Sequence, residues 1–159
     1  MGVIDALFGR SEQQNPHEQI ISSLAQLDPA LSGAFRAYIT NRARLSVLTR
    51  EAVEGYQMVK SKTKNEQTRV TEPFLREALQ LIENQRRLIT QMHEVSKKRR
   101  FKMMKDLEQA LNSVKKTEET LRRVAAAVND PSINRLQGMN DALTMHKSME
   151  SAVLWPTLR

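Results

Sequence analysis

The sequence predicts an all-α protein, an elongated antiparallel helical hairpin or coiled coil with one very long central helix and a C-terminal helix. Aromatic residues make up only 4% of the 159 residues, which is a poor composition for β-strands. Leu, Ala, Met, Gln, Glu, Lys and Arg are abundant, and these residues lose little side-chain freedom in a helix. Apolar residues also recur every three or four positions, as they do on the buried side of a helix.

Pairs of an Asx residue and a proline mark the expected helix starts, because the Asx side chain caps a helix and proline suits its first position. Such pairs occur at Asn15-Pro16, Asp28-Pro29 and Asp130-Pro131, and Thr71-Glu72-Pro73 is a weaker example. The expected elements are helices at 16–27, 29–61, 72–128 and 131–154, with a loop at 62–71.

The helix at 29–61 carries a seam of apolar residues typical of a coiled coil. Its positions are Leu31, Phe35, Tyr38, Arg42, Leu45, Leu48, Ala52, Tyr56 and Val59. The loop at 62–71 can turn this helix antiparallel to the next one. We therefore expect a hairpin core at 16–128, between an N-terminal apolar segment and linker at 1–15 and a C-terminal helix and tail at 129–159.

The helix at 72–128 carries two blocks of seam residues separated by a phase break at Arg99. The first block is Phe74, Ala78, Leu81, Gln85, Leu88, Met92 and Val95, and the second is Met103, Leu107, Ala110, Val114, Thr117, Leu121, Val124 and Val128. As one unbroken rod this helix would be roughly 85 Å long. The helix at 131–154 either folds back on the second block or extends the rod, and the sequence leaves both arrangements open.

Six cationic side chains lie close together around the phase break: Lys97, Lys98, Arg99, Arg100, Lys102 and Lys105. On one continuous helix they would encircle the axis and resist burial. We therefore expect an exposed ring of positive charge in the middle of the long helix, between the parts covered by two partner helices. Three interpretations remain open for it. It is a solubilising collar, a contact for a polyanion such as membrane head groups or non-specific nucleic acid, or a pairing site for acidic subunits. A second, looser group of basic residues includes Arg36, Arg42, Arg44 and Arg50 on the helix at 29–61.

Both ends of the chain carry apolar residues suited to a contact. Val3, Ile4, Leu7 and Phe8 form one face of two helical turns, which either contacts a membrane interface or packs on a neighbouring subunit. Leu154, Trp155 and Leu158 form an apolar hook for a partner.

No catalytic or metal-binding motif accompanies these features. The three histidines are isolated, the five glycines are scattered, and there is no cysteine. We therefore expect a non-enzymatic protein with no catalytic residue, no metal, no cofactor and no small-molecule substrate.

Several stretches together resemble the ESCRT-III family of membrane-remodelling polymers. They are the N-terminal Leu7-Phe8-Gly9, the helix start Pro16-His17-Glu18, and the basic run before a Leu-rich stretch in KKRRFKMMKDLEQAL. The resemblance implies filaments that bind acidic membranes through the basic arm and insert the N-terminal segment. The acidic C-terminal half of that family has no counterpart here, since residues 129–159 are neutral.

The expected function is a self-assembling helical scaffold, a homo-oligomer that binds an anionic membrane surface through its basic region. The alternative is a structural subunit of a virion, tail or secretion machine that contacts nucleic acid or acidic subunits. The corresponding locations are cytoplasmic, peripheral membrane, or within a large assembly.

Overall fold

The computed structural model describes residues 16–128, 130 and 134–151, and every regular element in those ranges is an α-helix. This confirms the all-α prediction. The helices are α2 (Pro16–Leu27), α3 (Pro29–Val59), α4 (Lys64–Arg99), α5 (Met104–Ala126) and α6 (Arg135–Ser151).

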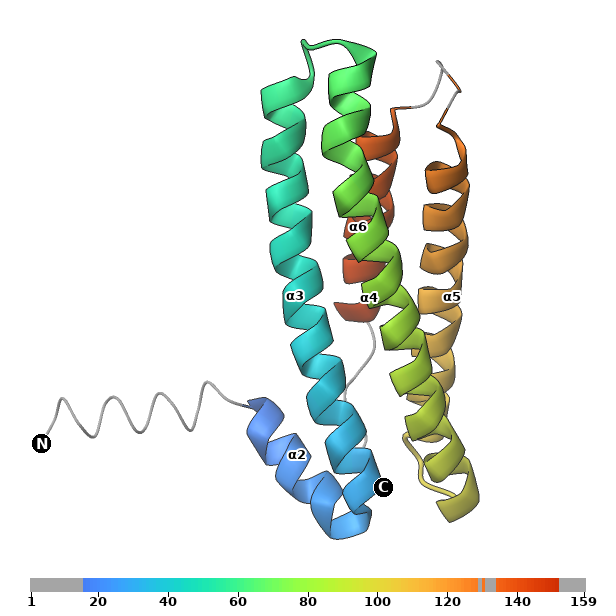
Figure 1. Cartoon of the computed structure of the whole chain (residues 1–159). Coiled ribbons are helices and arrows are strands. Elements are labelled where there is room, and N and C mark those ends of the chain that lie inside the picture. The colour runs from blue at the N-terminus through green and yellow to red at the C-terminus, as the bar shows by residue number, and fades with distance from the viewer. Residues whose placement is uncertain (1–15, 129, 131–133, 152–159) are drawn as a thin grey trace, which may run out of the picture.

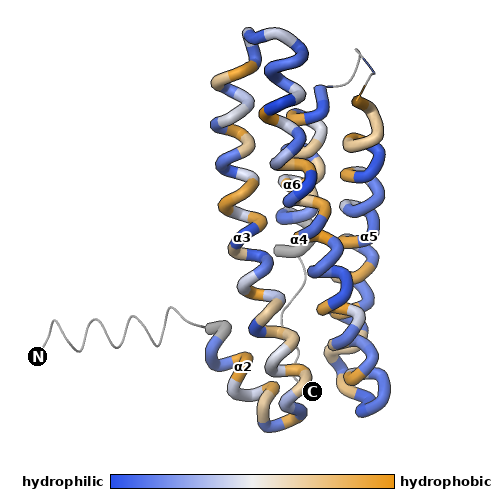
Figure 2. The backbone as a smooth tube through the Cα atoms, viewed as in Figure 1, coloured by the Kyte–Doolittle hydropathy of each residue, from blue (hydrophilic) through white to orange (hydrophobic). Residues whose placement is uncertain are grey.

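The last four helices form an up-down-up-down bundle, in which each helix runs antiparallel to the next (Figure 1). Helix α3 packs on α4, α4 on α5, α5 on α6, and α6 returns to α3. Helix α6 is short and covers only the part of the bundle near the α3–α4 turn, whereas α2 packs on α3 at the opposite end (Figure 1). Figure 2 shows apolar and polar residues alternating along the four helices, the pattern expected when each buries one side.

Capping side chains set the starts of α3 and α4. The Asp28 carboxylate accepts a hydrogen bond from the Ala30 amide at 2.8 Å, with Pro29 at the first helical position as predicted. At α4 the Thr63 hydroxyl accepts from the Glu66 amide at 3.3 Å. The expected loop at 62–71 is therefore wrong, because the Thr-x-x-Glu capping signal starts the helix at Lys64 and Pro73 lies inside it.

The predicted antiparallel pairing of α3 with α4 is confirmed by contacts along both helices. The Asn41 side-chain amide donates to the Leu81 carbonyl at 2.7 Å, and the Arg44 guanidinium donates to the Glu77 carboxylate at 2.5 and 2.7 Å. At the far end of the pair, Arg99 lies 3.3 Å from Asp28. The start of α3 thus faces the end of α4.

The seam predicted for α3 is largely buried, and the one predicted for the following helix is buried in part. Ala78, Gln85 and Met92 are fully buried as predicted. Leu75, Ile82 and Ile89 are buried as well, whereas Leu81 and Leu88 lie half-buried at the edge of the buried face. The physical reason is that α4 contacts α3, α5 and α6, so its buried face is wider than a two-helix seam.

The single rod expected at 72–128 is wrong. Helix α4 ends at Arg99, α5 starts at Met104, and the chain reverses direction between them (Figure 1). The phase break marks this reversal, and the second seam block folds back beside the first. Met103, Leu107, Ala110, Val114, Thr117 and Leu121 are all buried as predicted, but within the bundle.

Helix α6 folds back on α5, which decides between the two arrangements left open by the sequence. Arg135 as a whole is only 8% exposed. Its guanidinium donates to the carbonyls of Val124 and Ala125 at 3.2 and 3.0 Å and also forms an ion pair with Glu72. A Cβ at Gly138 would lie 3.1 Å from the Val124 side chain, so the two helices are in close contact there.

Candidate polyanion-binding surface

The predicted basic cluster lies at the α4–α5 turn, at one end of the bundle rather than around the middle of one long helix. The turn closes with two backbone hydrogen bonds. The Arg100 amide donates to the Lys97 carbonyl at 3.3 Å, and the Phe101 amide donates to the Ser96 carbonyl at 2.9 Å. This pattern is a Schellman motif, which ends a helix by satisfying its last carbonyl groups.

Arg100 occupies the left-handed position of this motif, with φ 56° and ψ 40°. Glycine is the usual residue there, because a Cβ at positive φ costs roughly 1–2 kcal/mol. It is the one non-glycine residue with positive φ among those that the structure describes. The chain therefore carries a cation at a site where backbone energetics favour glycine.

Most of the cluster is exposed and lacks an acidic partner. We call the five residues Lys97, Lys98, Arg100, Lys102 and Lys105 the basic end. All five are exposed, and none forms an ion pair within the described ranges. The sixth cation, Arg99, pairs with Asp28 and lies 5.5 Å from the centre of the Phe101 ring.

Helix dipoles explain only part of this charge. Lys97 and Lys98 lie in the last turn of α4, where the partial negative charge of the carbonyl groups favours cations. Lys102 and Lys105 lie at the start of α5, where the exposed amides disfavour them, and Asp106 is the acid in its first turn. The excess of cations on the α5 side is thus not required by the fold.

The remaining predicted contact residues are outside the described ranges. They are Val3, Ile4, Leu7 and Phe8 near the N-terminus and Leu154, Trp155 and Leu158 near the C-terminus.

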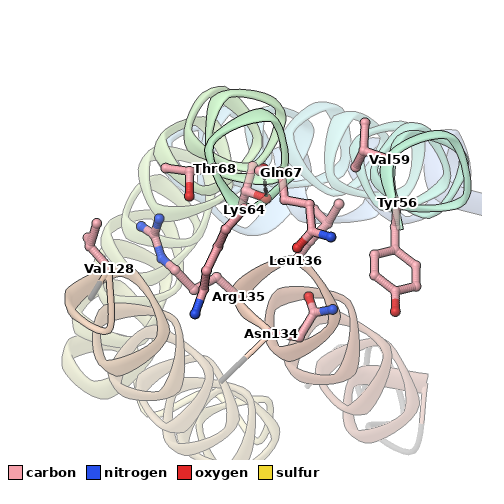
Figure 3. Close-up of a pocket in the computed structure, with 10 residues that line it drawn as sticks. Tyr56, Val59, Lys64, Gln67, Thr68, Val128, Asn134, Arg135 and Leu136 are labelled. Carbon is pink, nitrogen blue, oxygen red and sulfur yellow. Dashed lines mark hydrogen bonds between the residues drawn. The ribbon is translucent and has the colours of Figure 1, made fainter. Parts of the chain in front are cut away.

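The opposite end of the bundle contains a small cavity, shown in Figure 3, that the sequence did not indicate. It lies where α3, α4 and the start of α6 meet, and Arg135, Lys64 and Gln67 are among the residues that line it. Its volume of about 30 Å³ has room for about one or two water molecules, so it is a packing defect rather than a ligand site.

Sequence reasoning also missed the ion pair between Arg44 and Glu77. The hydrogen bonds from Arg44 hold the pKa of the Glu77 carboxyl below its ordinary value of 4.5, and Glu77 raises the pKa of Arg44. The two residues are distant in sequence and sit on separate helices, so only the pairing of α3 with α4 reveals the contact.

Within the residues that the structure describes, no helix is both long and apolar enough to cross a membrane, and no cluster of His, Asp and Glu side chains could hold a metal ion. No protein-family model, curated protein or solved structure matches this chain.

Proposed function

We propose that this protein is a non-enzymatic helical scaffold that self-assembles and binds anionic membrane head groups through its basic end. The observation that carries the proposal is the concentration of exposed, unpaired cations on one turn, including an arginine at a backbone position that favours glycine. A solubilising role would not require the charges to gather at one end of the bundle.

The position of the cluster supports end-on binding. The basic end lies at the tip of the bundle, with the α2–α3 corner beside it through the Arg99–Asp28 ion pair. Lysine and arginine side chains at such a tip can approach a flat layer of head groups without displacing any helix. Contacts of this kind depend on charge and are weakened by salt.

The strength of the contact explains why assembly belongs to the proposal. An anionic leaflet contributes about 1 kcal/mol for each Lys or Arg held near its surface. The five residues of the basic end therefore supply about 5 kcal/mol, equivalent to a dissociation constant of roughly 0.2 mM. Stable attachment then needs either several copies acting together or a second anchor. The N-terminal apolar face of Val3, Ile4, Leu7 and Phe8 is the proposed second anchor.

Flotation with anionic vesicles tests the proposal. In the basic-end variant, glutamine replaces all five residues of the basic end. A matched control variant loses the same charge from exposed lysines elsewhere, namely Lys60, Lys62, Lys64, Lys115 and Lys116. The basic-end variant should lose flotation while the control variant retains it.

Two further results would decide the rest of the proposal. Deletion of residues 2–9 should also abolish flotation if the apolar face is the second anchor. Equal loss of flotation in the basic-end and control variants would mean that only net charge matters, and would refute the assignment of the site. A high ratio of absorbance at 260 to 280 nm in purified protein, lost in the basic-end variant, would favour nucleic acid as the polyanion.

A further inference from the structure

A groove lies between α5 and α6, which pack side by side and antiparallel (Figure 1), and the basic end is not part of it. Its volume is about 430 Å³. Its lining residues are Lys116, Thr117, Thr120 and Val124 of α5 and Gly138, Asp141, Ala142 and Met145 of α6. Met145 is 62% exposed. An apolar surface rimmed by polar residues is typical of a contact with another macromolecule.

The hydroxyl groups that line the groove already have partners within their own helix. The Thr117 hydroxyl donates to the Ser113 carbonyl at 3.1 Å, and the Thr120 hydroxyl donates to the Lys116 carbonyl at 2.9 Å. Neither hydroxyl therefore needs a polar group from a ligand. The groove presents mainly apolar surface, which suits the surface of another protein better than a small polar molecule.

Two residues of opposite charge flank the groove, one on each helix. Lys116 of α5 and Asp141 of α6 are both exposed, and among the residues that the structure describes neither forms an ion pair. Asp141 accepts a hydrogen bond from the Gln137 side chain at 2.8 Å. The best-matched partner therefore brings one charge of each sign together with an apolar surface, and a second copy of this chain does so.

We propose that the groove is an interface between two copies of this chain, related by a two-fold axis that runs along the bundle. This interface rests on the self-assembly in the proposed function and names its surface. In a two-fold interface, each contact occurs twice with the roles of the copies exchanged. Helix α5 of each copy then lies on α6 of the other, so Met145 packs on the α5 of the second copy and Lys116 faces the Asp141 of the second copy.

The charges select this axis over the other two-fold arrangement. With the axis across the bundle, α6 would lie on α6. Asp141 is central among the groove residues of α6, so it would then face Asp141 of the second copy, and like charges at an interface repel. The axis along the bundle also places the basic ends of both copies at the same end of the dimer. Both can then contact one layer of head groups, as multivalent attachment requires.

Analytical ultracentrifugation of the full chain over a range of concentrations tests the charge pairing. Asp141→Lys and Lys116→Asp each bring like charges together across the interface, so each variant alone should dimerise about tenfold or more weakly than the unmodified chain. An equimolar mixture of the two variants should recover the dimer, because opposite charges then meet at both positions. An ion pair within one chain would not give this recovery.

The neutral change Lys116→Gln introduces no repulsion, and an exposed ion pair contributes little by itself. Dimerisation should therefore be nearly unchanged in Lys116→Gln, and the control variant of the flotation assay stays valid.

The apolar part of the interface is tested by Met145→Gln, which should also weaken dimerisation by about tenfold, since each dimer loses two buried methionine side chains. The matched control is Met58→Gln, because Met58 is 76% exposed on α3 and does not line the groove. Both side chains are exposed, so the thermal midpoint of dilute protein should stay the same in both variants.

The outcomes separate this interface from the proposed function. Assembly that is unchanged in Met145→Gln, or a mixture of the two charge variants that stays monomeric, overturns the interface but not self-assembly. A chain that is monomeric at every concentration overturns both. The basic-end variant should dimerise like the unmodified chain, so loss of its flotation with an intact dimer supports both sites.

Discussion

Replacing Arg100 with glycine should stabilise the fold, although it removes a long side chain. Arg100 has φ 56°, and a Cβ in this region costs roughly 1–2 kcal/mol. Glycine avoids this cost but gains freedom in the unfolded chain, which offsets about 0.4–1 kcal/mol. The two hydrogen bonds of the turn come from backbone amides, so both remain in the variant. The net gain is about 0.5–1 kcal/mol.

Thermal unfolding followed by circular dichroism measures this gain. For a chain of this size, 1 kcal/mol shifts the midpoint by about 2–4 °C, so Arg100→Gly should raise it by about 1–4 °C. Arg100→Ala is the matched control, because it removes the same charge but keeps a Cβ at positive φ. A rise of equal size in both variants would mean that charge repulsion, not backbone strain, is relieved. A lower midpoint for Arg100→Gly would refute the reasoning altogether.

Three further variants test the packing and the ion pairs. Leu107→Ala removes a fully buried side chain of α5 and should cost about 2–5 kcal/mol in urea unfolding. Arg135→Met removes the side-chain hydrogen bonds to the carbonyls of Val124 and Ala125 and leaves Glu72 without its cation, and it should cost about 2–3 kcal/mol in the same assay. Because Arg44 lowers the folded pKa of Glu77, their contact contributes stability above the ordinary carboxyl value of 4.5 and loses it as the pH falls through the lower folded value. Below pH 4.5, the midpoint of unfolding should therefore fall less steeply in Glu77→Gln than in the unmodified chain.

Each of these variants has an outcome that contradicts its reasoning. A cost below about 1 kcal/mol for Leu107→Ala would show that α5 is not held in the bundle core. An unchanged free energy of unfolding in Arg135→Met would mean that water replaces Arg135 as the donor to the carbonyl groups. An unchanged acid profile for Glu77→Gln would show that its contact with Arg44 does not persist in solution.

Local sequence signals predicted much of the fold correctly. Asp28 and Pro29 mark the start of α3 because capping and proline geometry act within a few residues. The capping signal at Thr63 is equally local, but the sequence prediction took Thr71-Glu72-Pro73 as the helix start and so placed the start of α4 too late. Proline lacks an amide donor, yet a long packed helix tolerates one lost hydrogen bond.

The turn at Arg100 had no comparable local signal. A Schellman motif usually shows a glycine, and this one has an arginine, so the residues predicted a continuous helix instead of a reversal. The charge of the six clustered cations is enough to predict that they lie on the surface of the protein. Their location at a bundle end depends on contacts between segments far apart in the chain.

By itself, the sequence determined that the chain is helical, that α3 and α4 pair in antiparallel fashion, and that a solvent-exposed cationic cluster follows the first seam block. Only the tertiary structure decided where the chain reverses and that the cationic cluster lies at one end of the bundle. The physical reason is one of scale. A continuous α4 and a turn at Arg100 differ by roughly 1–2 kcal/mol of local backbone energy. In contrast, burial of each large apolar side chain of α5 against the bundle contributes about 1.5–3 kcal/mol.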